Sequence, residues 1–173
     1  MRDFSECEVL AVLERLERTG IECWVDGGWG IDALLGVQTR PHRDLDLVLD
    51  RAQIPSARRA LIPLGYERDD SVKPGWPARC PLRNPENARV DLHPVVFDAH
   101  GHGWQQLDRD AWGQYPADGL TATGEIAGKP VRCLTPQLQL RHHLGYRLAD
   151  EDHHDLRLLA KRFGLSLPPD VSG

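Results

Sequence analysis

The sequence predicts an α/β (α+β) fold in which a mixed sheet is flanked by helices and further helices follow at the C-terminal end. Three observations support this class. Apolar residues recur at helical spacing in 5–20, leucines alternate with other residues in 44–50, and only helical patterns follow residue 135. Because 173 residues can form one core but not two enzymatic domains, we expect a single domain over 1–173 with a helical portion from about residue 135.

The first half of the chain alternates helices and strands. Ser5-Glu6-Cys7-Glu8 has the pattern of a capping box, which predicts an amphipathic helix that ends at Gly20. A short apolar strand, 23–25, then meets Asp26-Gly27-Gly28, and helical spacing resumes as far as Gly36. In 44–50 the leucines lie on one strand face, and the aspartates at 44 and 46 lie on the other.

The second half is predicted to contain hairpins followed by two helices. The expected elements are a helix over Ala52–Leu64 with Asp50 as its cap, a hairpin at 84–87 leading into a strand at 88–93, a flexible turn at His100–Gly103, a hairpin over 121–134, a helix from Thr135 toward Tyr146, and a last helix capped by Asp150 and ending at Gly164.

Composition and charge exclude several functional classes. No segment has the roughly 20 apolar residues that a membrane span requires, and the N-terminus lacks a signal-peptide pattern, so we expect a cytoplasmic protein without a membrane partner. A net charge of -5 argues against binding to nucleic acid and favours a cationic second substrate. The four cysteines contain no Cys-x-x-Cys pair, so we expect reduced and mostly buried thiols.

The strand at 44–50 carries the residues with the clearest chemical role. Asp44 and Asp46 are two positions apart on one strand, so their carboxylates point the same way and can converge on hard cations such as magnesium. Asp91 lies on another alternating strand and would complete a three-carboxylate cluster if the two strands pair. Three carboxylates with two metal ions suit in-line displacement at phosphorus.

Residues before this strand are suited to binding phosphate. Gly27 and Gly28 open directly into a helix, where backbone N–H groups can approach an anion without interference from a side chain. Arg40, His42 and Arg43 precede the carboxylate strand and are within reach of phosphate oxygens. Each feature alone is more typical of a turn or a surface charge, and only the ordered set is specific.

This ordered set resembles the polymerase-beta-like nucleotidyltransferase superfamily, and within it the small antibiotic nucleotidyltransferases. The C-terminal segments resemble the end of the lincosamide nucleotidyltransferases. The matching segments are Trp24-Val25-Asp26-Gly27-Gly28-Trp29-Gly30-Ile31-Asp32, Thr39-Arg40-Pro41-His42-Arg43-Asp44-Leu45-Asp46, Val90-Asp91-Leu92-His93-Pro94, Gly145-Tyr146 and Asp152-His153-His154-Asp155-Leu156. The resemblance extends from the first helix to about Leu159.

The resemblance implies a set of roles for residues of this chain. Asp44, Asp46 and Asp91 would bind magnesium as two ions, and Asp91 would also be the general base. The triphosphate of ATP or another nucleoside triphosphate would be held by Gly27, Gly28, Arg40 and Arg43, and His93 and Tyr146 would lie near the acceptor or nucleotide. A homodimer is also implied. We assign Asp26 and Asp32, which flank the glycine turn, structural and capping roles.

The predicted reaction is magnesium-dependent transfer of AMP to a hydroxyl of an antibiotic, with a lincosamide favoured over an aminoglycoside. Other readings remain open at this stage. The acceptor could be a housekeeping metabolite, and the chain could instead be a silent nucleotide-binding or antitoxin-like domain. His142-His143 with Asp152-His153-His154 could also suggest a metal-dependent hydrolase, although the last three residues fall on a predicted helix rather than on a strand.

Overall fold

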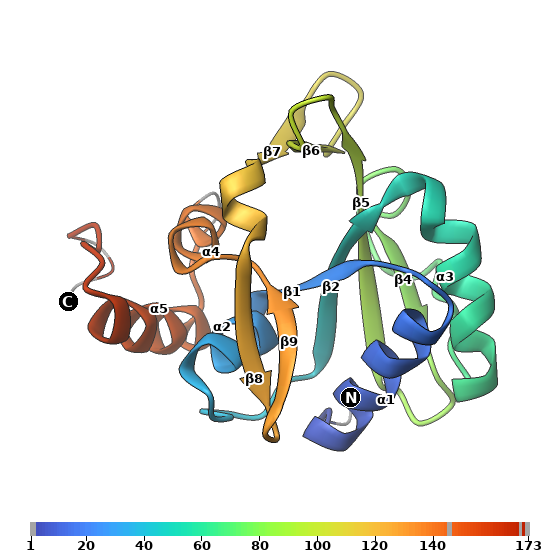
Figure 1. Cartoon of the computed structure of the whole chain (residues 1–173), viewed down its shortest axis with the longest axis horizontal. Helices are drawn as coiled ribbons and strands as arrows, with labels where there is room; N and C mark the ends of the chain where they lie inside the picture. Colours follow the sequence, from blue (N-terminus) through green and yellow to red (C-terminus); the bar gives the residue numbers. More distant parts are fainter. Residues whose placement is uncertain (1–2, 145–146, 170, 172–173) are drawn as a thin grey trace.

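The computed structural model describes residues 3–144, 147–169 and 171, and its elements follow the predicted alternation (Figure 1). The helices are α1 (Glu6–Arg18), α2 (Gly27–Leu35), α3 (Ile54–Leu61), α4 (Pro136–His143) and α5 (Asp150–Phe163), with 3-10 turns at Arg51–Gln53, Ile62–Leu64 and Ala117–Leu120. The strands are β1 (Cys23–Asp26), β2 (Asp44–Asp50), β3 (Glu67–Arg68), β4 (Cys80–Arg83), β5 (Arg89–Phe97), β6 (Gly103–Gln106), β7 (Trp112–Tyr115), β8 (Ala122–Ile126) and β9 (Lys129–Cys133).

The sheet is mixed, as predicted. Its strands run in the order β3-β4-β5-β2-β1-β9-β8, and the β6–β7 hairpin continues from the end of β5. The pairs β2–β5 and β1–β9 are parallel, whereas the other pairs are antiparallel. Figure 1 shows this hairpin standing away from the helices that cover the rest of the sheet. The arrangement leaves β2 in the middle of the molecule, between β1 and β5.

The two faces of β2 have different surroundings, as its sequence alternation predicts. Leu45, Leu47 and Leu49 are fully buried in the main core, which also contains residues of α1, α2 and α3. On the opposite face Val48 packs in a smaller cluster that includes Leu138 of α4. Because the leucines fix the register of β2, its aspartates must point away from the main core.

Helix caps explain where the helices begin. The Ser5 side chain accepts a hydrogen bond from the Glu8 backbone, which confirms the predicted capping box of α1. Asp50, the predicted cap of a helix over Ala52–Leu64, caps the 3-10 turn Arg51–Gln53 by accepting from the Ala52 N–H at 2.8 Å, and the α-helix itself is limited to Ile54–Leu61. The predicted cap of α5 is wrong by one position, because Ala149 is the N-cap and Asp150 is the first helical residue.

The segment after β5 differs from its prediction. The turn at His100–Gly103 is held by the Asp98 carboxylate, which accepts from the backbone N–H groups of His100 and His102 at 2.8 and 3.0 Å. It leads into the β6–β7 hairpin, which the sequence pattern did not indicate. The four cysteines are free thiols, as predicted: Cys80 and Cys133 are buried, Cys23 is half-buried and Cys7 is exposed.

The C-terminal helices pack against α2. Leu156 and Leu159 of α5 are fully buried and form a cluster with Ile31 of α2. Helix α4 ends at His143, and the predicted helical residues Gly145 and Tyr146 lie outside the described residues. Among the helices that the structure describes, none is long and apolar enough to cross a membrane.

Candidate active site

Three aspartates form a row across neighbouring strands at the centre of the sheet. Asp46 of β2 is paired in register with Asp26 on antiparallel β1 and with Asp91 on parallel β5. Paired residues on adjacent strands place their side chains on the same face. The sequence predicted that Asp91 joins the cluster only if its strand pairs with that of Asp46. The structure contains this pairing.

The row lies beside the first residue of α2. Asp26 is the N-cap of this helix, as predicted, and its carboxylate accepts from the Gly27 N–H at 2.7 Å. Gly27 has a φ of 62°, in the left-handed region that favours glycine. A Cβ atom at this position would lie 2.6 Å from Oδ2 of Asp46. Glycine is thus required both for the turn and for the close approach of the Asp46 carboxylate.

Each of the three predicted metal ligands uses one carboxylate oxygen in a contact with a basic side chain. Oδ2 of Asp44 is bound by Arg89, Oδ1 of Asp46 lies 3.0 Å from Nε2 of His93, and Oδ2 of Asp91 lies 3.2 Å from Nη1 of Arg79. Among the described residues, no hydrogen bond reaches the second oxygen of any of the three. For Asp91 this second oxygen, Oδ1, is fully buried.

The acidic groups repel one another. Burial raises the pKa of Asp44 above its usual value, and the negative charge of Asp46 raises it further. Burial and the charge of Asp46 likewise raise the pKa of Asp91, although Arg89 and Arg79 oppose the shift. A divalent cation would relieve this repulsion, and the donors are oxygen atoms of the kind that magnesium prefers.

The carboxylates are nevertheless not gathered into a finished metal site. Within 3–144, 147–169 and 171, no group of three or more His, Cys, Asp or Glu side chains is arranged to hold a metal ion. Asp91 is fully buried, whereas Asp44 and Asp46 are half-buried. Asp44, Asp46 and Asp91 each keep an uncommitted oxygen that suits a cation, but their roles as metal ligands stay predictions.

A chain of hydrogen bonds supports Asp46 from the β6–β7 hairpin. The Tyr115 hydroxyl donates to Oε1 of the buried Gln105 at 3.1 Å. Nε2 of Gln105 donates to the Ala78 carbonyl at 2.7 Å and lies 3.2 Å from Nδ1 of His93. Since that amide nitrogen donates to Nδ1, the proton of His93 is left on Nε2, directed at Asp46. The hairpin thus fixes the orientation of a side chain that contacts the row.

We expect Gln105→Leu to lower kcat/KM about 10- to 100-fold, because His93 and through it Asp46 would lose their fixed orientation. Tyr115→Phe should lower kcat/KM less than Gln105→Leu does and cost about 1 kcal/mol in the free energy of unfolding, because the Gln105 amide nitrogen would keep its contact with His93. Steady-state kinetics and thermal unfolding measure the two. Equal kinetic losses in both variants would contradict this order.

A cavity of about 590 Å³ opens over Asp26 and Asp46 of the row. Its lining contains Asp26 and Asp46, but neither Asp44 nor Asp91. Basic side chains outnumber these two carboxylates. They are Arg79, His93, Arg141, His142 and His143, and Leu107 and Tyr115 add apolar area. The net charge of -5, which favoured a cationic second substrate, is therefore not reflected in the lining of this cavity.

A larger cavity of about 780 Å³ lies elsewhere and is lined by Arg51, Arg58 and Trp76 among others. Neither Gly27 nor Asp46 contributes to it, and Arg79 is shared by both cavities. We place the candidate site in the smaller cavity because two aspartates of the row, Asp26 and Asp46, and Gly27 at the start of α2 line it.

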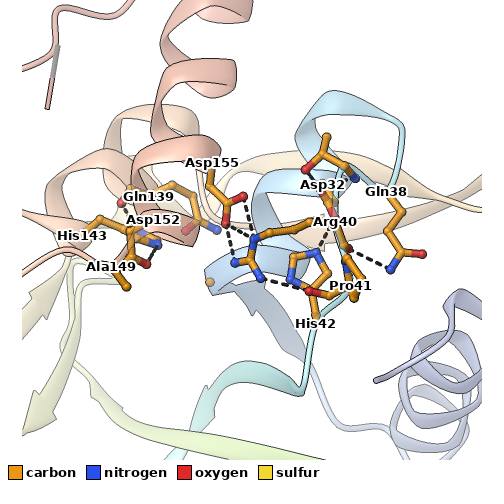
Figure 2. A network of polar contacts seen from close by, with 12 residues as sticks. Asp32, Gln38, Arg40, Pro41, His42, Gln139, His143, Ala149, Asp152 and Asp155 are labelled. Carbon is orange, nitrogen blue, oxygen red and sulfur yellow. Dashed lines mark hydrogen bonds and ion pairs between the residues drawn. The ribbon is translucent and has the colours of Figure 1, made fainter. Parts of the chain in front are cut away.

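The predicted phosphate-binding residues lie around the same helix start. Gly28 lies close to the side chains of both Arg40 and His42, which a Cβ atom at this position would meet at 2.9 and 2.4 Å. Arg43 is exposed, immediately before β2. Arg40 is held by Asp155 of α5, as Figure 2 shows. Tyr146, predicted to lie near the acceptor, falls outside the described residues.

Several side chains of the cavity carried no signal in the sequence. Gln105 and Tyr115 come from the hairpin that was not predicted, and Arg79 comes from an irregular segment before β4. His142 was noted only as a possible hydrolase residue, yet its ring packs edge-on against Tyr115 with centroids 4.5 Å apart. His153 and His154 lie on α5 and do not line the cavity.

Comparisons with known proteins agree with this geometry. A model of the family described as aminoglycoside-2''-adenylyltransferase matches residues 8–159. A lincosamide resistance protein from Staphylococcus haemolyticus is 30% identical over 90% of this chain and 94% of its own length. A 2''-aminoglycoside nucleotidyltransferase from Klebsiella pneumoniae is 27% identical over 70% of this chain and 63% of its own length.

Solved structures show the same fold. A lincosamide antibiotic adenylyltransferase, LnuA, with lincomycin bound superimposes with a TM-score of 0.80 and 28% identity, covering 91% of this chain and 98% of that one. The aminoglycoside enzyme ANT(2'')-Ia, in complex with adenylyl-2''-tobramycin, gives a TM-score of 0.73 at 20% identity over 92% of this chain and 89% of its own. The second likeness bears on the fold alone.

Proposed function

The chain belongs to the aminoglycoside-2''-adenylyltransferase family, and from this premise we propose that it transfers AMP from ATP to a hydroxyl of a lincosamide such as lincomycin or clindamycin. The observation that carries the reaction is the position of Asp46, which is packed against Gly27 at the start of α2 with Asp91 beside it. This arrangement brings carboxylates and a helix N-terminus, which favours phosphate, to one point.

We assign Asp44, Asp46 and Asp91 as ligands for magnesium, as two ions. The uncommitted oxygen of each carboxylate and the repulsion among them support this assignment. Bound magnesium would supply charge neutralisation for the triphosphate and the leaving pyrophosphate. In this proposal Gly27, Gly28, Arg40 and Arg43 hold the triphosphate through backbone N–H groups and guanidinium groups.

The proposed transfer forms one phosphorus–oxygen bond and breaks another. The acceptor hydroxyl oxygen forms a bond to the α-phosphorus while the bond from that phosphorus to the bridging oxygen breaks, and pyrophosphate leaves. The hydroxyl proton passes to the Asp91 carboxylate, whose raised pKa makes it a stronger base than an exposed aspartate. In this proposal His93 contacts the acceptor or the nucleotide, and its position in the lining of the cavity supports the role.

The lining of the cavity favours a lincosamide over an aminoglycoside as acceptor. A lincosamide has one basic amine on a large, partly apolar body, whereas an aminoglycoside is a polycation. The two arginines of the lining, Arg79 and Arg141, would repel the several ammonium groups of an aminoglycoside, but one amine can pair with a single carboxylate. The similarity to the lincosamide resistance protein over nearly its whole length supports the same choice.

We further propose that the protein acts as a cytoplasmic homodimer and as one domain over residues 1–173. The cavity is partly open to solvent, so a second subunit could supply a further wall. The cytoplasm is the compartment that provides ATP and magnesium together.

An acceptor screen with labelled ATP and magnesium tests the function. We expect labelled AMP on lincomycin and clindamycin, with release of pyrophosphate, and at least about tenfold lower kcat/KM for kanamycin and tobramycin, because a polycation meets the basic lining. Efficient transfer to the aminoglycosides without transfer to lincosamides would overturn the acceptor while keeping the reaction. Absence of transfer to every acceptor would favour a silent nucleotide-binding domain.

A further inference from the structure

Arg40, one of the proposed triphosphate ligands, is joined to the C-terminal helix by a buried ion pair. Its Nε and Nη2 donate to Oδ1 and Oδ2 of Asp155 at 2.9 and 2.6 Å, so the contact is bidentate. The Asp155 side chain is completely buried, and the Arg40 side chain is 22% exposed. Figure 2 shows the Arg40 guanidinium facing Asp155 on α5, with His42 and Asp32 beside it.

The contacts of Arg40 leave part of its guanidinium available. Nη1 donates to the Pro41 carbonyl at 3.1 Å, and Nε and Nη2 each use one N–H on Asp155. A guanidinium has five N–H donors. Within the described part of the chain, one N–H on Nη1 and one on Nη2 therefore remain for another acceptor.

The uncommitted edge of Arg40 lies at the start of α2. Nη2 would be 2.9 Å from a Cβ atom placed on Gly28, the second residue of this helix. On the same side His42 is bound by Asp32, whose other oxygen accepts from the Thr39 hydroxyl at 2.7 Å. The segment that carries Arg40 is thus fixed at both of its ends. Its guanidinium can turn only if the contact with Asp155 is broken.

We propose that Asp155 is a positioning residue for the nucleotide: it holds the Arg40 guanidinium with its remaining N–H groups directed at the triphosphate. Through this pair, helix α5 becomes part of the nucleotide site, although Asp155 lies 115 positions after Arg40 in the chain. This inference rests on the proposed function, in which Arg40 binds ATP. A purely structural role would instead stabilise the fold and affect both substrates equally.

Calorimetric titration of the full chain with α,β-methylene-ATP in the presence of magnesium, and separately with lincomycin, distinguishes these roles. Asp155→Asn keeps the shape of the side chain but removes the charge that fixes Arg40. We expect about tenfold weaker binding of the ATP analogue and lincomycin binding within about twofold of the unmodified protein. Unchanged nucleotide binding, or equal losses for both ligands, would overturn the proposal.

Two further variants keep the test decisive even where loss of the buried charge lowers stability. Arg40→Lys retains the positive charge but not the bidentate fork, so it should also weaken nucleotide binding about tenfold. Adding Asp155→Asn to Arg40→Lys should cause no further loss of nucleotide affinity, because the guanidinium that Asp155 holds is already absent. Additive losses of affinity would count against the proposal. Circular dichroism confirms that each variant is folded.

Asp69→Asn is the matched control. It disrupts another aspartate–arginine pair, in which Oδ2 of Asp69 lies 2.5 Å from Nη2 of Arg83, and neither residue lines the candidate site. Its nucleotide affinity should match that of the unmodified protein, and a tenfold loss there would show that any broken pair has this effect. AMP transfer by the unmodified protein is measured in parallel, so that failure of the proposed function is recognised separately from failure of the Asp155 inference.

Discussion

Asp46→Asn is expected to reduce kcat/KM for AMP transfer at least about a thousandfold, equivalent to about 4 kcal/mol of transition-state stabilisation. The amide has nearly the same shape as the carboxylate, but it lacks the charge that holds a divalent cation. Asp46 is also central to the row, since it is paired with both Asp26 and Asp91. Of the three aspartates of the row, Asp46 is the one that is paired in register with both of the others.

The fold should survive this change, because Asp46 is half-buried and lies on the strand face away from the leucine core. Asp50→Asn is the matched control on the same strand. Its carboxylate caps a 3-10 turn by accepting from Ala52, and asparagine caps as well as aspartate does. Transfer kinetics with varied magnesium compare the two variants. Activity of Asp46→Asn within tenfold of the control would disprove the metal assignment.

Sequence alternation predicted the centre of the fold well for a physical reason. A strand has a period of two, so the leucines of 44–50 had to face the core and Asp46 had to face away from it. The β6–β7 hairpin was not predicted, because Gly103–Gln106 and Trp112–Tyr115 are short and their sequences show little alternation in polarity. Short strands of this kind are defined by the partner with which they pair.

In the candidate site, too, local features could be predicted from the sequence, but contacts between distant segments could not. The motif around Asp44 and Asp46 and the Gly27-Gly28 turn are local features that residue spacing can identify. The support of His93 by Gln105 and of Arg40 by Asp155 joins segments that are distant in sequence, so only the folded chain could reveal it. Net charge also misled the expectation for the cavity, because charges that lie elsewhere on the surface do not determine a local lining.

Gly27→Ala is expected to lower kcat/KM about a hundredfold or more, because the added methyl group would lie 2.6 Å from Oδ2 of Asp46 and would displace that carboxylate. The variant should also lose about 1–2 kcal/mol in the free energy of unfolding, since alanine resists the left-handed conformation at a φ of 62°. Both effects arise at one atom, so a control must separate backbone strain from the contact with Asp46.

Gly36→Ala provides that control at the other end of the same helix. Gly36 is the C-cap of α2 with a φ of 73°, and a Cβ atom there would meet nothing within 4 Å. It should therefore lose a similar amount of stability but keep its activity within about threefold, because strain of this size leaves a still-folded enzyme at 25 °C. Thermal unfolding and steady-state kinetics on both variants measure the two effects. If Gly36→Ala lost as much activity as Gly27→Ala, strain in α2 rather than contact with Asp46 would explain the requirement for glycine.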